Sequence, residues 1–240
     1  MKYKQLIQTL SETTLEYHDA LNPDLWDGDT LKPQVASKLI MIAHTWAAFS
    51  KIPTHAIKDI ILVGGNANYN YTQFSDIDLH LVVDTSVLGE CEEVIQEYLR
   101  NKKQLWSFLH DIKIYGHDVE LYAQDIKIPF VSGQGVYSIQ DNKWLSKPEY
   151  KQVDLDDPNV QKKVNDYAKR IDTLISSGAD DKSFENMKEK LRNMRSSGLQ
   201  AGGEFAPENL AFKELRNLGH IDRLNDYLHS AQDKRLSLEK

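Results

Sequence analysis

Two aspartates one residue apart, Asp76 and Asp78, open an apolar run and are the residues of this chain best suited to chemistry. In a β-strand, side chains two residues apart project from the same face, so the two carboxylates would lie side by side. Like charges at that separation repel each other, and a divalent cation is the usual compensation. Because oxygen ligands favour hard cations, the spacing predicts a site for Mg²⁺ (or Mn²⁺).

A third carboxylate is expected, because two-metal phosphoryl transfer uses acidic ligands that hold two cations about 3.5–4 Å apart. Glu120 stands between Val119 and Leu121, so in a strand its side chain points away from both apolar neighbours. Asp118 would share the face of Glu120 and is a second candidate, whereas Asp125 lies past the predicted strand. We therefore expect a neighbouring strand to bring Glu120 to the two aspartates.

A pair of glycines, Gly64 and Gly65, follows the apolar run 60–63. Glycine leaves the backbone amides open to the close approach of a phosphate. Asn66, directly after the pair, could add a side-chain donor, and Ser75 could donate its hydroxyl. Together with the metal site, these residues predict metal-assisted chemistry on a nucleoside triphosphate.

This combination resembles the DNA polymerase β-like nucleotidyltransferase superfamily. The matching residues are Val63-Gly64-Gly65, Asp76-Ile77-Asp78-Leu79 and Val119-Glu120-Leu121, and the resemblance covers residues 60–122, about a quarter of the chain. It implies that Asp76 and Asp78 bind both catalytic metals and that Glu120 holds the metal that activates the attacking hydroxyl. It also implies transfer of an NMP from an NTP, with ATP the expected donor, to an acceptor hydroxyl with release of pyrophosphate.

Within that superfamily, many relatives carry Ser where this chain has Gly65, which puts more weight on the backbone amides and on Ser75. The basic motifs of tRNA CCA-adding enzymes and the long insertion of template-directed polymerases are not seen. The wider sequence resembles the small nucleotidyltransferases of bacteriophages. The acceptor stays open between a small molecule, a protein and an RNA end.

Two other functions also stay open. One is a non-catalytic nucleotide- or protein-binding module on the same fold, and the other is an interaction protein stabilised by Ca²⁺. His80 alternates to the face of the two aspartates, and Tyr69 and Tyr71 lie in the loop before them. These three could contact substrate, or could simply pack within the fold. The single cysteine, Cys91, lacks a surrounding constellation for nucleophilic catalysis.

The elements that must position these residues follow from hydrophobic periodicity and turn residues. The predicted strands are 60–63, 77–83, 112–114, 118–122, 135–139 and 144–145. The predicted helices are 4–17, 33–50, 90–110, 158–175, 183–195, 208–218 and 221–230, with an exposed loop over 198–207. We expect an α+β fold, with a nucleotidyltransferase-type mixed β-sheet flanked by helices in a domain over 1–150. A helical C-terminal domain or appendage over 151–240 would follow.

Composition limits the partners. Of the 240 residues, 40% are hydrophobic and 27% charged, which is ordinary for a soluble globular protein. The formal net charge of −7 disfavours broad affinity for nucleic acid, so no extended DNA binding is expected. The basic stretch 182–195 is interpreted as a solvated helix face, in which Arg192 and Arg195 are candidates for acceptor contact.

No apolar run approaches the roughly 18 residues that a membrane span needs, so no membrane association is expected. The lone cysteine excludes an internal disulfide and suits a reducing compartment. These observations predict a cytoplasmic protein, in the host cytoplasm if it is phage-encoded.

Overall fold

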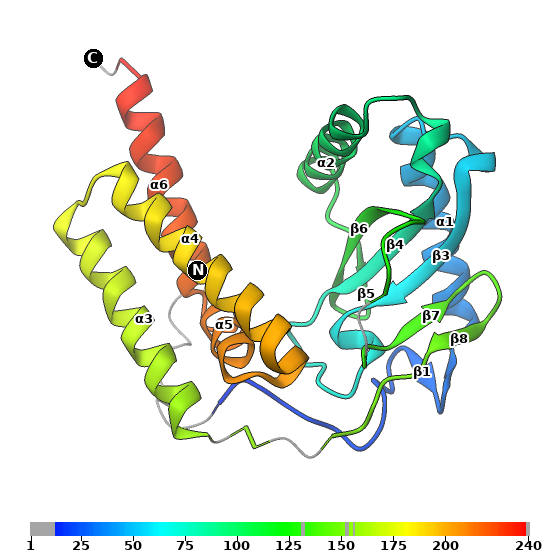
Figure 1. The fold of residues 1–240 in the computed structure, drawn as a ribbon, viewed down its shortest axis with the longest axis horizontal. Helices are drawn as coiled ribbons and strands as arrows, with labels where there is room; N and C mark the ends of the chain where they lie inside the picture. Colours follow the sequence, from blue (N-terminus) through cyan, green and yellow to red (C-terminus); the bar gives the residue numbers. More distant parts are fainter. Residues whose placement is uncertain (1–12, 131–132, 152–153, 156, 239–240) are drawn as a thin grey trace. The chain divides into compact units, whose positions relative to one another are not determined.

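The computed structural model of the chain describes residues 13–130, 133–151, 154–155 and 157–238. They form two compact units (Figure 1). The α/β unit is Tyr17–Lys151, and the helical unit joins residues 13–16 to the described residues from 154 onward.

A six-stranded sheet forms the centre of the α/β unit, with the strand order β5-β6-β4-β3-β7-β8. The strands are β3 (Ile57–Val63), β4 (Ile77–Val83), β5 (Lys113–Ile114), β6 (His117–Asp125), β7 (Val136–Ser138) and β8 (Lys143–Ser146). Strand β6 runs parallel to β4, whereas the other neighbouring pairs are antiparallel. The expected mixed sheet is therefore confirmed.

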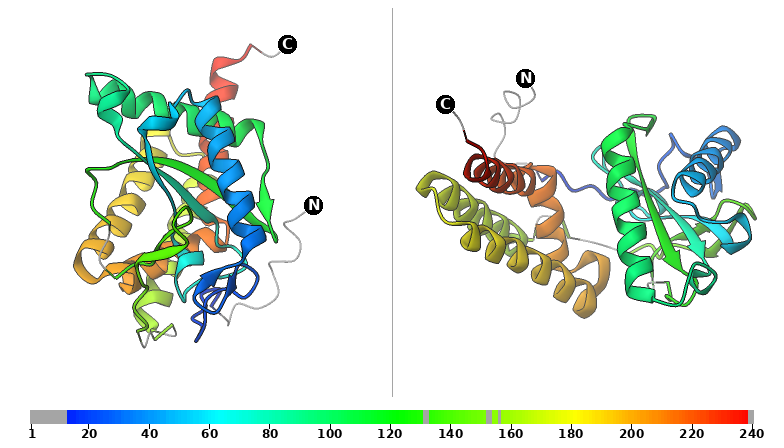
Figure 2. Two further views of the ribbon diagram at one scale, coloured as in Figure 1. Left: turned by 90° about the vertical axis from the view of Figure 1, so that its right-hand side faces the viewer. Right: turned by 90° about the horizontal axis from the view of Figure 1, so that it is seen from above.

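Alternation along β4 separates the core from the site. Ile77, Leu79 and Leu81 are fully buried, whereas Asp78 and His80 project from the opposite face and are half-buried. Two helices, α1 (Pro33–Phe49) and α2 (Glu92–Leu109), add apolar side chains to the same core as the buried residues of β4. Figure 2 shows α1 and α2 from two further directions. This arrangement leaves the polar face of β4 available for chemistry.

A short hairpin precedes α1, where the sequence indicates only turns. Its strands are β1 (Trp26–Asp27) and β2 (Thr30–Leu31), and Gly28 between them has a φ of +56°. The ring of Trp26 stacks on Trp144 of β8 with centroids 4.9 Å apart. The hairpin thus closes the β8 edge of the sheet through aromatic packing, a long-range contact that local turn residues do not reveal.

The helical unit consists of α3 (Pro158–Ser177), α4 (Asp181–Gly202), α5 (Pro207–Asn217) and α6 (His220–Leu236). Asp157 caps α3 by accepting from the backbone N–H of Asn159, and Asp180 caps α4 by accepting from that of Ser183. Such caps satisfy backbone donors that have no partner within the helix. The expected helical C-terminal region is confirmed.

The prediction of an exposed loop over 198–207 is wrong, because α4 continues through Gly202 and a short 3₁₀ helix, Gly203–Phe205, follows. Gly198 explains the difference. A Cβ on it would lie 2.7 Å from Cβ of Glu208 and 3.1 Å from the backbone nitrogen of Asn209. The glycine permits the close approach of α4 and α5. It therefore serves helix packing at a position where the sequence predicts a loop.

The N-terminal segment is tied to the helical unit. The carboxylate of Glu214, 3% exposed, accepts from the Thr14 backbone N–H at 3.0 Å and from the Thr14 hydroxyl at 2.6 Å. Leu15 is buried in the core of the same unit. The helix expected over 4–17 lies mostly outside the described residues, and 13–17 are not helical.

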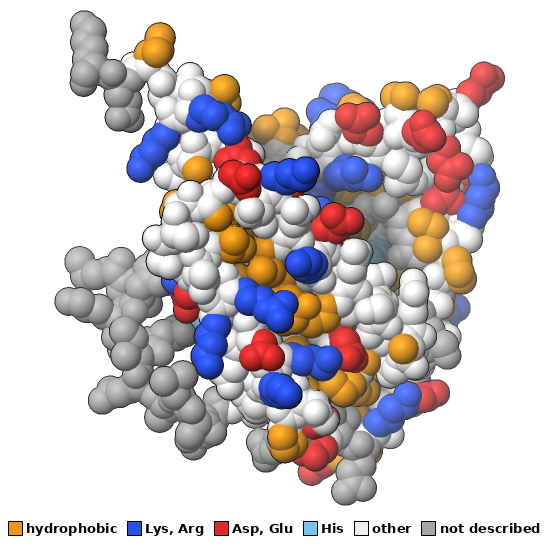
Figure 3. Space-filling view, turned by 60° about the vertical axis from the view of Figure 1, so that its left-hand side comes forward, with side chains coloured by type: hydrophobic (Ala, Val, Ile, Leu, Met, Phe, Trp, Pro, Cys, Tyr) orange, Lys and Arg blue, Asp and Glu red, His pale blue; other side chains and the backbone are white. Residues whose placement is uncertain are grey.

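Charges of both signs and hydrophobic side chains are interspersed on the face shown in Figure 3. On α4, Lys188 lies 4.0 Å from Glu185, and the guanidinium of Arg195 lies 5.0 Å from the ring centroid of Phe212. Among the described residues, no helix is long and apolar enough to cross a membrane.

Candidate functional site

The parallel pairing of β4 with β6 aligns two acids. Asp78 and Glu120 are Cα partners in this register, and the flanking pairs Ile77–Val119 and Leu79–Leu121 turn to the other face. Paired strands lie about 4.8 Å apart, so both carboxylates leave the sheet side by side. Strand β6 thus places Glu120 beside Asp78 in the register of the sheet, and the joint role of the three acids stays a prediction.

Asp76 directly precedes β4. It lines a cavity of about 320 Å³ together with Asp118 and Glu120 of β6, Trp106 of α2 and His110, the residue after α2. This cavity is acidic on its sheet side, which makes it suitable for a cation. Asp76 and Glu120 therefore share this cavity, and Asp78 is the strand partner of Glu120.

Gly64 directly follows β3 and lies beside Asp78. A Cβ at this position would lie 1.8 Å from Oδ2 of Asp78, and the φ of +77° is one that other residues rarely adopt. Val63, the residue before it, is the Cα partner of Asp78. The carboxylate thus occupies the space that a side chain at position 64 would fill, so the glycine is required twice over.

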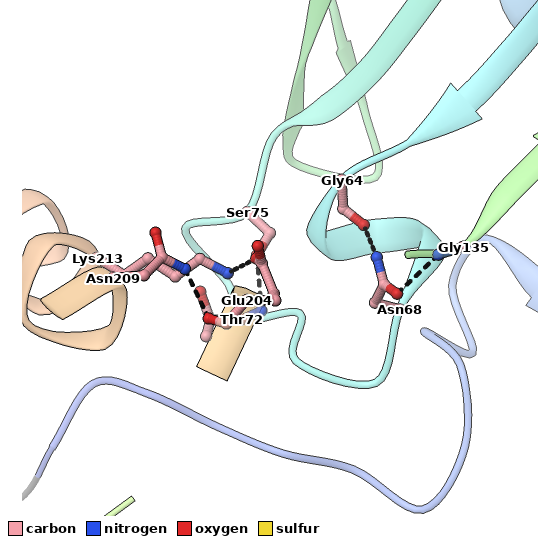
Figure 4. A network of polar contacts seen from close by, with 8 residues as sticks. All are labelled: Gly64, Asn68, Thr72, Ser75, Gly135, Glu204, Asn209 and Lys213. Carbon is pink, nitrogen blue, oxygen red and sulfur yellow. Dashed lines mark hydrogen bonds and ion pairs between the residues drawn. The ribbon is translucent and has the colours of Figure 1, made fainter. Parts of the chain in front are cut away.

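The corner after Gly64 is fixed by side chains on both sides, as Figure 4 shows. The carboxamide of Asn68 donates to the carbonyl of Gly64 at 2.6 Å and accepts from the backbone N–H of Gly135 at 2.9 Å. The hydroxyl of Ser75 accepts from the backbone N–H of Thr72 at 2.9 Å. Ser75 retains its own hydroxyl proton as a donor.

Asn66 is fully buried and its carboxamide bonds within the protein. Its Nδ2 donates to the carbonyls of Ser75, at 3.1 Å, and Asp76, at 3.0 Å, while its Oδ1 accepts from Nδ2 of Asn22 at 2.8 Å. Both amide protons are therefore in use. In this structure Asn66 positions the backbone that carries Asp76, whereas the sequence predicts that it binds phosphate.

His117 completes this buried network from β6. Its Nδ1 lies 2.6 Å from the carbonyl of Ser75, and its Nε2 lies 3.0 Å from Nδ2 of Asn22. Because a carbonyl only accepts, Nδ1 carries the proton and Nε2 accepts from Asn22. Asn22, Asn66 and His117 together hold the Ser75–Asp76 backbone against the sheet.

Glu120 is engaged from α2 and from its own strand. Nζ of Lys103 lies 3.0 Å from its Oε2, and the Tyr122 hydroxyl donates to the same oxygen at 2.6 Å. Burial, followed by the hydrogen bond to Glu120 and the charges of Glu120, Asp78 and Asp76, raises the pKa of Tyr122 far above its usual range. The phenol therefore stays protonated and remains a donor to the carboxylate.

The donor set fits a hard cation, since oxygen ligands from three carboxylates suit Mg²⁺. The space that Gly64 leaves for Asp78 also fits a fixed ligand. Yet across the described part of the chain, no three His, Cys, Asp or Glu side chains lie close enough to hold a metal ion in this conformation. The contacts of Glu120 with Lys103 and Tyr122 hold its carboxylate in place, which is a physical reason why the three acids do not form a metal cluster in this conformation. The metal site stays a prediction.

The remaining candidates take structural contacts. Asp118 is paired with Lys113 and half-exposed, and buried Asp125 accepts from the Thr85 hydroxyl. Tyr71 stacks on the ring of His18 with centroids 3.9 Å apart. His80 pairs with Gln124 at 2.9 Å, and burial lowers the pKa of its imidazole.

No family model and no curated protein matches the chain. Among solved structures, it is similar to the STING-associated CdnE c-di-GMP synthase from Capnocytophaga granulosa, with 14% sequence identity over 84% of each chain and a TM-score of 0.22. A TM-score this low carries no argument about function, which therefore rests on the geometry of the site.

Two groups of site residues have no local signature in the sequence. Asn22 and His117 are 95 residues apart, and no local pattern connects them. Lys103 lies 17 residues before its partner Glu120, on a different element. A single cue exists for Lys103, since a lysine among the apolar positions of an amphipathic helix near the sheet needs a countercharge.

Proposed function

We propose that the α/β unit is a Mg²⁺-dependent nucleotidyltransferase that moves an NMP from an NTP, with ATP the expected donor, to an acceptor hydroxyl. One observation carries the proposal: Asp78 pairs with Glu120 across parallel strands while Gly64 makes room for the Asp78 carboxylate. A turn that must be glycine, next to acids that repel each other, is hard to explain by stability alone.

Each residue has a role in this proposal. The backbone amides at Gly64 and Gly65 and the hydroxyl of Ser75 bind the triphosphate. Asp76, Asp78 and Glu120 would hold Mg²⁺ (or Mn²⁺), which when bound supplies charge neutralisation and activates the acceptor hydroxyl.

The reaction balances without a further reagent. The acceptor oxygen forms a bond to the α-phosphorus, the bond from that phosphorus to the β-phosphate oxygen breaks, and pyrophosphate leaves. The proton of the hydroxyl passes to Glu120 or to solvent. Most of the rate enhancement would come from orientation and electrostatic stabilisation.

The test is incubation of the full chain with each α-labelled NTP and Mg²⁺, in the presence of small-molecule, protein and RNA acceptors. We expect label transfer and pyrophosphate release, both abolished by a chelator and restored by Mg²⁺. Asp78→Asn should lower the rate by about three orders of magnitude or more, since it removes a metal ligand. Asp118→Asn, on the same sheet face but paired with Lys113, is the matched control and should retain activity.

Absence of nucleotide binding and of transfer with every NTP would contradict the proposal. ATP binding without turnover that Asp78→Asn leaves unchanged would instead favour a non-catalytic binding module. If Asp118→Asn abolishes transfer and Glu120→Gln does not, Asp118 is the third ligand.

A further inference from the structure

A second cavity, of about 300 Å³, lies on the far side of Glu120 between α2 and β6. Helix α2 contributes Gln96, Arg100, Lys103 and Gln104, which follow each other by four, three and one residues, and β6 contributes Tyr122. That spacing places the four side chains on one face of the helix. The cavity is thus built by two rigid elements.

The polar part of this lining is suited to an anion. It combines a guanidinium, an ammonium, two carboxamides and a phenol with the apolar side chains of Leu99 and Ala123, and it includes no acidic residue from the described part of the chain. The neighbouring cavity has the opposite character, with Asp76, Asp111, Asp118 and Glu120 in its wall. Two adjoining cavities of opposite charge favour ligand groups of opposite charge.

The two cations of the cavity differ in their partners. Arg100 is exposed and has no ion pair among the residues that the structure describes. The Lys103 side chain is 22% exposed, lies 3.0 Å from Oε2 of Glu120 and sits 3.3 Å from the ring centroid of Tyr122. On its other side Arg100 lines a surface pocket with Glu92, Glu93 and Glu97, and it forms no ion pair with them, so its guanidinium can turn to an anion between α2 and β6. Lys103 would be shared between that anion and Glu120.

The cavity is separate from the expected triphosphate site. Gly64 directly follows β3, and the order β6-β4-β3 puts two strand spacings, about 10 Å, between β3 and β6. A phosphate beside β6 would therefore lie about two strand spacings from the backbone amides at Gly64 and Gly65.

We infer that this cavity binds a phosphate group carried by the acceptor, so that the acceptor is a phosphorylated molecule. The identification of the phosphorylated molecule as the acceptor rests on the proposed function. Binding of its phosphate group does not require turnover. Arg100 binds the phosphate oxygens in a fork, and Gln96 and Gln104 add neutral donors. The positive charges of Arg100 and Lys103 disfavour small-molecule acceptors that are themselves cations.

Lys103 links the two cavities. A cation bound at Glu120 replaces Lys103 as the countercharge of that carboxylate, and Lys103 is then available to the phosphate. Acceptor and metal binding should therefore strengthen each other, and this coupling is reciprocal.

The test measures binding of inorganic phosphate and of methyl phosphate to the metal-free full chain by calorimetry. Arg100→Gln should weaken both about tenfold or more, because it removes a charge-assisted hydrogen bond. Lys102→Gln is the matched control, since Lys102 lies over the rings of Phe49 and Tyr98 and should leave binding unchanged. Glu120→Gln should tighten binding, because it frees Lys103.

Equal affinities in the wild type, Arg100→Gln and Lys102→Gln would overturn the inference, whatever the transfer assay shows. So would binding of inorganic phosphate with exclusion of methyl phosphate, which would assign the cavity to the free ion. Weaker phosphate binding in Glu120→Gln would overturn the coupling through Lys103.

Discussion

Acidic residues outnumber basic ones by 18 to 12 in the α/β unit over 17–151, whereas residues 157–238 of the helical unit hold 13 acidic and 14 basic residues. In the helical unit, charges pair between helices, as in Arg223 with Asp172 at 2.9 Å and Lys163 with Glu208 at 3.0 Å. In the α/β unit, acids gather on one sheet face.

The two units also use buried polar groups differently. In the helical unit, partly buried Glu204 accepts hydrogen bonds from Asn209 and Lys213 (Figure 4). Buried Glu214 accepts from Thr14, so these groups fix the packing of segments. The buried amides around Asn66 and His117 instead fix a backbone that carries an acid. Polar groups serve stability in the helical unit and the positioning of acids in the α/β unit. Variants in the helical unit should therefore change the free energy of unfolding, and variants in the α/β unit should change activity.

Among variants that disturb the positioning of the acids in the α/β unit, Gly64→Ala should cause the largest loss of transfer activity. The new Cβ collides with the Asp78 carboxylate at a φ of +77°, so we expect transfer activity to fall by about two orders of magnitude or more. Gly116→Ala is the control, since its φ is +90° but nothing lies within 4 Å of the added Cβ. Equal losses of activity in both variants would show that backbone strain alone is responsible.

His117→Ala tests the buried network. The carbonyl of Ser75 and the amide of Asn22 lose their partner, so Asp76 is held less firmly. Removing a group that orients a metal ligand typically lowers metal affinity or activity by about 10–100-fold. The expected signature is a higher Mg²⁺ concentration for half-maximal activity. Exposed His44 on α1 provides the control, and an unchanged Mg²⁺ dependence in His117→Ala would contradict the positioning role.

Glu214→Ala addresses the helical unit. It leaves the Thr14 N–H and hydroxyl without their acceptor, which should lower the free energy of unfolding by about 2–3 kcal/mol. Thermal unfolding measures this loss, and Glu214→Gln should recover part of it. Activity per folded molecule should not change, and a large fall there would place Glu214 among the positioning groups.

Substitution of His220 in the helical unit should give the smallest effect, a change in how stability depends on pH. Burial lowers the pKa of its imidazole, with Arg223 acting in the same direction and Asp172 opposing it. The unfolded chain then takes up this proton at a higher pH than the folded chain, so stability is lost as the pH falls below about 6.5. His220→Gln should reduce the difference in melting temperature between pH 7.5 and 5.5, whereas His229→Gln, exposed on the same helix, should not.

Local patterns predict the elements well. Strand β4 occupies the predicted 77–83 and α1 begins at the predicted Pro33, because alternation and helical periodicity are properties of neighbouring residues. The same logic fails at Gly198, where the reason for the glycine is a distant helix. Glycine marks a loop in sequence, but it can equally mark a tight contact.

The acids of the candidate site are predictable because strand alternation and the glycine pair are visible in the sequence. Their partners are not. Lys103 meets Glu120, and Asn22 meets His117, only once the sheet has set its strand order. Contacts of this kind depend on tertiary placement, so sequence alone assigns Asn66 to a ligand where the structure gives it protein partners.

The parallel alignment of β4 and β6 has a further consequence. Parallel neighbours cannot be joined by a tight turn, so the chain must travel back along the sheet between them, and here α2 makes that return. The connection that topology demands is therefore also the element that delivers Arg100 and Lys103 beside the acids. Under the proposed phosphate binding, substitutions on the side of this return helix that faces β6 would change what the protein recognises, while the strands that align Asp78 with Glu120 stay as they are.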